Sequence, residues 1–409
     1  MKCLTMFSIT LLVALLALFT NGAFADMNNS SVEKIDTANL ANDTIITAQD
    51  AIIHRHLVID MGDGLKTDAE VTLPVEGNGT HGTLPGILLI HGSGRTDMNE
   101  YVGTVKGLNE PTRPFLQIAE YLSPRGFVVL RYNKRGVGLN GTVLNASVVN
   151  DTTFEDLKND AKKALKVLED QPEVDRSDIT LLGHSEGTAI APRIAAEDKG
   201  VNKIVLMGAM AQNLKNLLYF QLVTRPLAAA EGDLDLDHNG QLSIKEVASK
   251  IGSPGENLAS GLVEKNNTTG QYEWNPEISA DRSGNISIQG DLRPRFIELF
   301  EKTATSNSWF RSHLALNDTL DVIGNVPASI LILNGENDAQ TPVGGALLLE
   351  QRLTAVRHPD HTLITYPGLG HSFYPTEGWS QPLGPVGENV LSDMYSWLTS
   401  PARNVRYLT

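Results

Sequence analysis

Ser185 is the residue whose type and surroundings most strongly indicate chemistry. It is the central residue of the pentapeptide Gly-His-Ser-Glu-Gly at residues 183–187, between an apolar run at 179–182 and a helical pattern at 188–197. A serine at a sharp turn from strand to helix is held out above a sheet, and the glycines let the backbone close up there. The pattern therefore predicts a nucleophile, and the alternative is a Gly-Ser turn without chemistry.

A serine hydroxyl is a weak nucleophile that needs a base, and the base needs an orienting acid. His371 is the candidate base because it follows a predicted strand at 362–366. The candidate acid is Asp338, in the loop after a predicted strand at 329–333, and Glu336 in the same loop is the alternative. We therefore expect Ser185, Asp338 and His371 to act together, in the chain order serine, acid, histidine.

The remaining histidines after the serine are expected to have no part in catalysis. His238 and His313 fall within a long interruption of the strand–helix pattern. His358 and His361 lie in a polar stretch before a predicted strand, so we expect them at the surface.

Two backbone N–H groups are expected to stabilise the negative oxygen of a tetrahedral intermediate. One belongs to Glu186, which directly follows the serine. The other comes from the loop His-Gly-Ser-Gly after a predicted strand at 86–90, with Ser93 favoured as the donor and Gly94 as the alternative. His91 and His184 are expected to be packing or hydrogen-bonding residues of their turns.

The elements that must position these residues are apolar strands that alternate with helical stretches. Continuous apolar strands separated by helices indicate a parallel sheet covered on both faces. The interruption at 211–325 is too long for an ordinary connection and predicts an inserted, mainly helical cap. We therefore assign residues 51–210 and 326–409 to an α/β catalytic domain.

The cap contains a segment, residues 235–246, that fits the EF-hand calcium loop at every diagnostic position. Gly240 makes the sharp turn, and the segment has oxygen ligands at the required places. The candidate ligands are Asp235, Asp237, Asn239, Gln241 through its carbonyl, Ser243 through water, and Glu246. This pattern predicts a structural Ca²⁺ ion in the cap, and the alternative is an acidic loop without an ion.

A second segment, residues 279–290, aligns with the first without gaps. Asp281 and Gly284 match Asp237 and Gly240, but Ser279 and Gly290 occupy the first and last positions, where carboxylates are required. We predict a degenerate partner that pairs with the first loop through a short β-bridge and binds an ion weakly or not at all.

The first residues predict export of the protein. Lys2, an apolar run at 11–19 and Ala-Phe-Ala at 23–25 have the order of a secretory signal, so residues 1–25 are expected to be removed and 26–50 to form a polar, mobile leader. The apolar run is shorter than the ~20 residues of a membrane-spanning helix, so we expect no membrane association after cleavage. The single cysteine, Cys3, is removed with the signal.

The negative net charge of the chain argues against nucleic acids and anionic membranes as partners. The formal net charge is −15, whereas nucleic acids and anionic membranes are bound through clustered Lys and Arg. No nucleic-acid partner is therefore expected.

The combination of these segments resembles the α/β-hydrolase superfamily, and in particular secreted carboxylesterases near the dienelactone-hydrolase-like and prolyl-oligopeptidase-like groups. The segments that carry the resemblance are PGILLIHGSG, PFLQIAEYLSPRGFVVLRYNKRGVG, LEDQPEVDRSDITLLGHSEGTAIAPRIAA, LILNGENDAQTPV and YPGLGHSF. The resemblance implies an α/β-hydrolase fold, a Ser185–Asp338–His371 triad and hydrolysis of a small carboxylic ester through an acyl-enzyme. Asn133 departs from the family, which usually has Asp there, at a position that is normally structural.

Two other functions fit the same residues. One is a peptidase of the same fold. The other, from a different class, is a calcium-dependent surface-binding protein whose hydrolase core has lost catalysis.

Overall fold

The computed structural model describes residues 44–46, 52–75, 82–103, 108, 110–252, 256–276, 278–279, 283–376 and 383–400. The expected signal at 1–25 lies outside the described residues, as does most of the expected leader at 26–50. The exception is β1 (Thr44–Ile46), which pairs antiparallel with Ile53–Arg55 of the next strand. The expectation of a leader without regular structure is therefore wrong for this segment.

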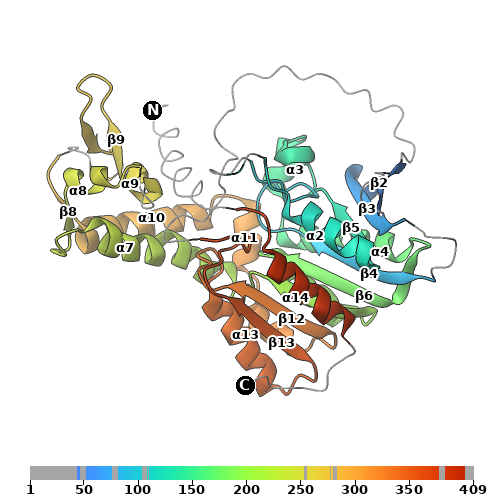
Figure 1. The fold of residues 1–409 in the computed structure, drawn as a ribbon. Coiled ribbons are helices and arrows are strands. Elements are labelled where there is room, and N and C mark those ends of the chain that lie inside the picture. The colour runs from blue at the N-terminus through green and yellow to red at the C-terminus, as the bar shows by residue number, and fades with distance from the viewer. Residues whose placement is uncertain are drawn as a thin grey trace.

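A mostly parallel sheet forms the centre of the molecule (Figure 1). In the described residues its nine strands have the order β1-β2-β3-β5-β4-β6-β7-β12-β13. Pairing is antiparallel from β1 to β5 and parallel from β5 to β13. The strands after β1 are β2 (Ile52–Gly62), β3 (Leu65–Pro74), β4 (Leu84–Ile90), β5 (Val128–Tyr132), β6 (Val174–His184), β7 (Val201–Met207), β12 (Ser329–Gly335) and β13 (His361–Tyr366).

Helices cover both faces of this sheet. One face packs against α2 (Pro114–Leu122) and α14 (Glu388–Thr399). The other packs against α4 (Phe154–Glu169), α5 (Gly187–Glu197) and α13 (Val343–Ala355). Because successive side chains of a strand point to opposite faces, Leu88 of β4 is in one core and Leu89 is in the other. The apolar run at 86–90 is thus buried on both sides, as its composition predicts.

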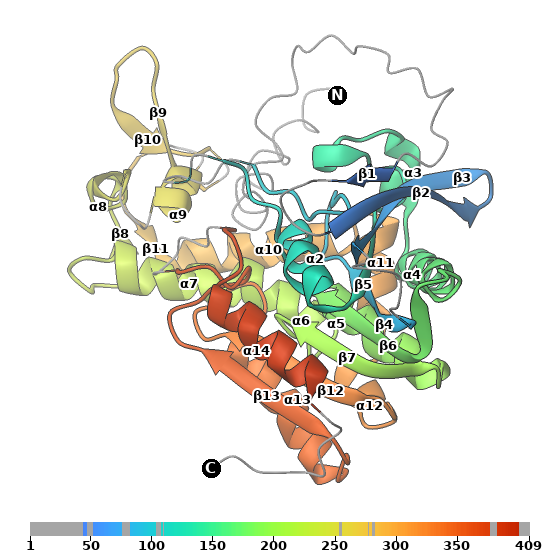
Figure 2. The same cartoon turned by 45° about the vertical axis from the view of Figure 1, so that its right-hand side comes forward.

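The chain between β7 and β12 forms an inserted, mainly helical unit that projects to one side of the sheet (Figures 1 and 2). It has a core of its own, which includes Leu222, Leu242, Trp274, Ile286 and Phe296. Its helices and π-helical turns are α6 (Leu214–Tyr219), η4 (Phe220–Thr224), α7 (Arg225–Ala229), η5 (Ala230–Leu234), α8 (Ile244–Ser249), α9 (Glu256–Leu262), η6 (Ile288–Leu292), α10 (Arg293–Ala304), α11 (Ser308–Leu314) and α12 (Thr319–Ile323). Its short strands are β8 (Gln241–Leu242), β9 (Val263–Lys265), β10 (Tyr272–Trp274) and β11 (Ile286–Ser287).

The remaining short elements lie between α2 and β5 and between β5 and α4. They are η2 (Ser123–Arg125), η3 (Leu139–Gly141) and α3 (Ala146–Asp151).

His358 is buried and the side chain of His361 is largely covered, which corrects the expectation that they lie at the surface. The ring of His358 is hydrogen-bonded to the carbonyl of Val326 at 2.9 Å. His361 lies 3.3 Å from a carboxylate oxygen of Glu350, and its side chain is 4% exposed. The polar stretch folds back against the segment that enters β12, so its histidines satisfy buried backbone and carboxylate groups.

No helix of the described residues is long and apolar enough to cross a membrane.

Candidate active site

Ser185 occupies a strained turn between β6 and α5. The strand ends at His184, the helix begins at Gly187, and Ser185 has a φ of 52°. A non-glycine residue in this left-handed region is held there by its surroundings at a cost in free energy. A hydrogen bond from the Ser185 N–H to the carbonyl of Met207, at 2.9 Å, contributes to this constraint. The turn leaves Ser185 at the carboxyl end of the parallel strands.

The glycines on either side of the turn are required by close packing of the backbone. A Cβ at Gly183 would lie 2.3 Å from the carbonyl oxygen of Gly187. A Cβ at Gly187 would lie 2.1 Å from the carbonyl oxygen of Ile90. The helix that starts here therefore passes directly against the end of β4, which brings the loop after β4 next to Ser185.

Gly187→Ala should destabilise the fold by roughly 3 kcal/mol or more, because the added methyl group overlaps a backbone oxygen that cannot move away. Thermal unfolding by circular dichroism measures the effect. Gly344→Ala is the matched control, since Gly344 lies in α13 and a Cβ there has nothing within 4 Å. That control should unfold at the wild-type temperature or slightly above it. Equal melting temperatures for the two variants would contradict the close approach of α5 to β4.

The structure brings His371 and Asp338 together in the loops after β13 and β12. Nδ1 of His371 lies 2.8 Å from Oδ2 of Asp338, and both residues are 4% exposed. Asp338 also accepts hydrogen bonds at 2.8 Å from the N–H groups of Gln340 and Thr341 and from the Thr341 hydroxyl. Because His371 donates its Nδ1–H to Asp338, its Nε2 atom carries no proton in the neutral ring and can accept one.

Burial of Asp338 alone would raise its pKa. The charge and hydrogen bond of His371 and the donors of Thr341 outweigh burial and hold the pKa of Asp338 below its usual range. The carboxylate therefore stays ionised at neutral pH, as an acid that orients a histidine must.

Glu336, the alternative acid, lies elsewhere. Its carboxylate accepts a hydrogen bond from the Thr365 hydroxyl at 2.8 Å, and the side chain is exposed. The structure thus pairs the base with Asp338.

Three backbone N–H groups in the two segments that meet at Ser185 are candidates for an oxyanion site. Among the described residues, the N–H groups of Ser93, Gly94 and Glu186 have no hydrogen-bond acceptor. Ser93 and Gly94 belong to the loop after β4, and Glu186 begins α5. A helix N-terminus adds a positive partial charge. These groups can stabilise an oxygen anion that forms on a carbonyl attacked by Ser185.

The two neighbours of Ser185 are buried in opposite electrostatic environments. His184 Nδ1 lies 2.8 Å from Oε2 of Glu100, and the His184 ring also contacts the carbonyl oxygen of His371 at 3.2 Å. Burial lowers the pKa of His184, but the Glu100 carboxylate outweighs burial and raises it. His184 is therefore a hydrogen-bonding residue of its turn, as expected from the sequence.

The Glu186 side chain is 1% exposed and has three nitrogen atoms close to its carboxylate. Lys134 Nζ lies 2.6 Å from Oε2, and Trp309 Nε1 and His313 Nε2 each lie 2.6 Å from Oε1. Burial would raise the pKa of Glu186, but Lys134 and His313 lower it far below its usual range. Trp309 and His313 belong to α11, so the insertion contacts the residue next to the nucleophile.

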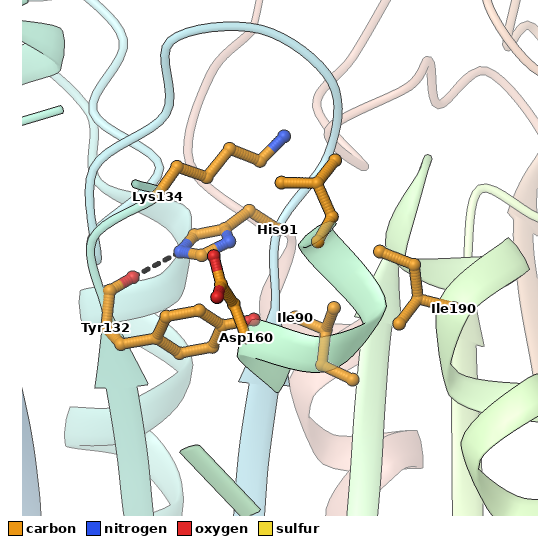
Figure 3. Close-up of a pocket in the computed structure, with 7 residues that line it drawn as sticks. Ile90, His91, Tyr132, Lys134, Asp160 and Ile190 are labelled. Carbon is orange, nitrogen blue, oxygen red and sulfur yellow. Dashed lines mark hydrogen bonds between the residues drawn. The ribbon is translucent and has the colours of Figure 1, made fainter. Parts of the chain in front are cut away.

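A small cavity lies beneath the loop after β4 (Figure 3). Its volume is about 10 Å³, and its lining includes His91, Tyr132, Lys134 and Asp160. His91 is hydrogen-bonded to the backbone oxygen of Tyr132, and burial lowers the pKa of His91 to about 4. A space of this size holds about one water molecule and is too small for an ester substrate.

The candidate calcium loop, residues 235–246, follows η5 and includes β8 and the start of α8. One ligand atom from each of Asp235, Asp237 and Glu246 lies within 4.8 Å of the other two. Oδ2 of Asp235 accepts the N–H of Gly240 at 2.8 Å, and Gly240 has a φ of 78°. The remaining predicted ligands, Asn239, Gln241 and Ser243, lie on the same turn. This set of hard oxygen donors fits Ca²⁺.

The predicted β-bridge between the two loops is present. Leu242 of β8 pairs with Ile286 of β11, and Gln241 pairs with Ser287. The middle of the second loop, residues 280–282, lies outside the described residues. The pairing buries Leu242 and Ile286 in the core of the insertion.

Four residues around the site were not predicted from the sequence. Gly208 follows β7 with a φ of 63°, and a Cβ there would lie 3.2 Å from the His371 ring. Glu100, Lys134 and Trp309 reach the Ser185 turn from distant parts of the chain. A glycine directly after a parallel strand could have indicated Gly208, but no local pattern distinguishes the other three.

The strand order, the serine turn after β6, and the acid and histidine after β12 and β13 are those of the α/β-hydrolase fold. A family model described as serine aminopeptidase, S33, matches residues 96–244, which include Ser185 and the start of the insertion.

Individual proteins match parts of the chain. Esterase EstD of Thermotoga maritima is 33% identical over 141 residues, which are 34% of this chain and 31% of EstD. Solved structures with partial similarity include a hypothetical protein from Pseudomonas aeruginosa, with a TM-score of 0.49, 14% identity and coverage of 90% of this chain and 99% of that one. Another is the α/β hydrolase GrgF from Penicillium sp. sh18, with a TM-score of 0.47, 16% identity and coverage of 84% and 97%.

Proposed function

We propose that the protein is a serine hydrolase that cleaves carboxylic esters through an acyl-enzyme on Ser185. The observation that carries this proposal is the buried Asp338–His371 hydrogen bond in the loops that follow β12 and β13. The identity with EstD, which covers only part of each chain, supports the ester as the substrate class.

Each residue has a defined step in the proposed reaction. Asp338 holds His371 with Nε2 free, and Nε2 takes the hydroxyl proton as Ser185 attacks the ester carbonyl. The N–H groups of Glu186 and Ser93, with Gly94 as the alternative, bind the oxygen anion. His371 then protonates the leaving alcohol, and water attacks the acyl-enzyme by the reverse proton transfers.

A peptidase of the same fold is the second candidate, because the matching family model is described as a serine aminopeptidase. A series of p-nitrophenyl esters with increasing acyl length, run beside aminoacyl p-nitroanilides, separates the two. We expect hydrolysis of the esters and little hydrolysis of the anilides, and Ser185→Ala should abolish the former. Faster turnover of the anilides would favour the peptidase, and hydrolysis of neither would favour a binding protein with an inactive core.

Calcium is proposed as a structural ion of the insertion. The loop from Asp235 to Glu246 includes β8 and the start of α8, at the end of the insertion far from the sheet in both views (Figures 1 and 2). At that distance the ion would not touch a substrate bound at Ser185. When bound, it would tie the end of η5 to the start of α8 and so stabilise the packing of the insertion.

Export is also proposed, on the composition of residues 1–25. Mass spectrometry of protein recovered from the culture medium tests it. The expected amino terminus is Asp26, and an intact Met1 would contradict cleavage.

A further inference from the structure

The peptide groups of Gly92 are bound on both sides by buried charged side chains. Its N–H donates to Oε1 of Glu100 at 2.6 Å, and its carbonyl accepts from Lys134 Nζ at 2.5 Å. The hydroxyl of Thr96 adds a longer hydrogen bond to the same carbonyl, at 3.3 Å. Gly92 directly precedes Ser93 and Gly94, so whatever holds Gly92 also sets the position of their N–H groups.

The same two side chains also bind the two neighbours of Ser185. The second oxygen of Glu100 lies 2.8 Å from His184 Nδ1, and Lys134 Nζ lies 2.6 Å from Oε2 of Glu186. Each charged residue therefore bridges Gly92 to one side of the nucleophile. These side chains are all largely covered, with exposed fractions of 1–12% for Glu100, Lys134, His184 and Glu186.

Gly92 packs closely against the Ser185 turn. A Cβ at Gly92 would lie 3.1 Å from the Ser185 Cβ and 3.4 Å from His184 Nδ1. Glu100 itself has a φ of 50°, and such a conformation persists only where the surroundings impose it. The loop after β4 and the Ser185 turn are thus in direct contact and are joined by two charge-assisted bridges.

We infer that Glu100 and Lys134 are positioning residues that lock the oxyanion loop to the nucleophile, each by bridging Gly92 to one neighbour of Ser185. This inference rests on the proposed serine-hydrolase function. Neither residue touches the reacting atoms. Their effect is transmitted through the N–H groups of Ser93 and Gly94, which must stay in place while charge develops on the substrate oxygen.

The inference predicts a defect that is specific to the transition state. Glu100→Gln keeps an oxygen for the Gly92 N–H but weakens the bridge to His184, and Lys134→Met removes both hydrogen bonds of the lysine. Loss of one oxyanion donor costs roughly 10²–10³ in kcat. Because these variants displace the donors without removing them, we expect kcat to fall by roughly 10- to 100-fold with KM within threefold of wild type.

The inhibition constant of a trifluoromethyl ketone that carries the acyl chain of the best ester substrate tests this prediction most directly. The tetrahedral adduct of the ketone places an oxygen anion in the same position as the transition state. Its inhibition constant should rise in each variant by about the factor by which kcat/KM falls. Since both bridges hold one peptide unit, the double variant should lose much less than the product of the single losses.

Two controls separate this role from general stability. Glu350→Gln disrupts another carboxylate–histidine pair, with His361, between α13 and β13, and should leave kcat and the inhibition constant unchanged. Lys134→Arg retains the charge and should recover part of the activity lost in Lys134→Met. Thermal melts of all variants report how much of each remains folded, and Lys134→Arg keeps the inference testable if Lys134→Met does not fold.

Inhibition constants that stay at the wild-type value while kcat falls would overturn the inference, as would raised KM with retained kcat. Lower melting temperatures with unchanged kcat per folded molecule would show that the bridges serve stability alone. Failure of the proposed function itself would look different, because the wild-type protein would then show neither ester turnover nor inhibition by the ketone.

Discussion

Asp338→Asn is expected to lower kcat by roughly 10⁴-fold while KM stays within a few-fold, the size of effect that this change has in other serine hydrolases. An asparagine cannot stabilise the charged imidazole ring of His371, and its amide can reverse the hydrogen bond to Nδ1. His371 would then carry its proton on Nε2, where it cannot accept one from Ser185. Steady-state hydrolysis of a p-nitrophenyl ester measures the loss.

Glu336→Gln is the matched control, because Glu336 lies two residues before Asp338 and was the alternative acid. Its carboxylate faces Thr365 and solvent, so kcat should remain within about twofold of wild type. If Glu336→Gln lost as much activity as Asp338→Asn, the assignment of the acid to Asp338 would be wrong.

Removal of calcium should lower the melting temperature by several degrees. An ion that binds with a dissociation constant of ~10⁻⁴–10⁻³ M contributes about 1.4–2.7 kcal/mol at 10 mM calcium, since the folded state alone offers the assembled site. Differential scanning calorimetry with calcium and with EDTA measures the shift. Glu246→Gln removes a charge from the ligand cluster and should abolish most of the calcium-dependent part.

Trp274 offers a second readout of the same binding event. Its indole N–H donates to the carbonyl of Gly284 in the second loop, and its side chain is fully buried in the core of the insertion. We therefore expect calcium to change tryptophan fluorescence with the same midpoint as the thermal shift. Glu298→Gln, at an exposed site on α10 that pairs with Lys302, is the control and should respond to calcium as wild type does. An EDTA-treated protein with unchanged melting temperature and activity would contradict the structural ion.

The catalytic sheet is predictable from the sequence where burial leaves a pattern. The run at 86–90 and the run at 179–182 became the inner parts of β4 and β6, because parallel strands covered on both faces must be apolar. The first half of β6 was missed because it is largely polar and half exposed. β1 was not predicted either, because a strand at the edge of a sheet does not need a continuous run of buried apolar residues.

The residues of the candidate site also differ in whether the sequence predicts them. Ser185, Asp338 and His371 could be selected because each follows a strand that the sequence reveals. Glu100 and Lys134 could not, because their roles depend on contacts with residues 84 and 52 positions away in the chain. The expectation of surface positions for His358 and His361 is wrong because polar side chains can be covered when they have partners, here Val326 and Glu350.

Covalent labelling with a fluorophosphonate tests the central claim most directly. The reagent phosphonylates an activated serine, and peptide mass spectrometry identifies the modified residue. We predict stoichiometric modification at Ser185 in the wild-type protein, slow modification in Asp338→Asn, and none in Ser185→Ala. A folded wild-type protein that stays unlabelled, or that is labelled at another serine, would contradict the account.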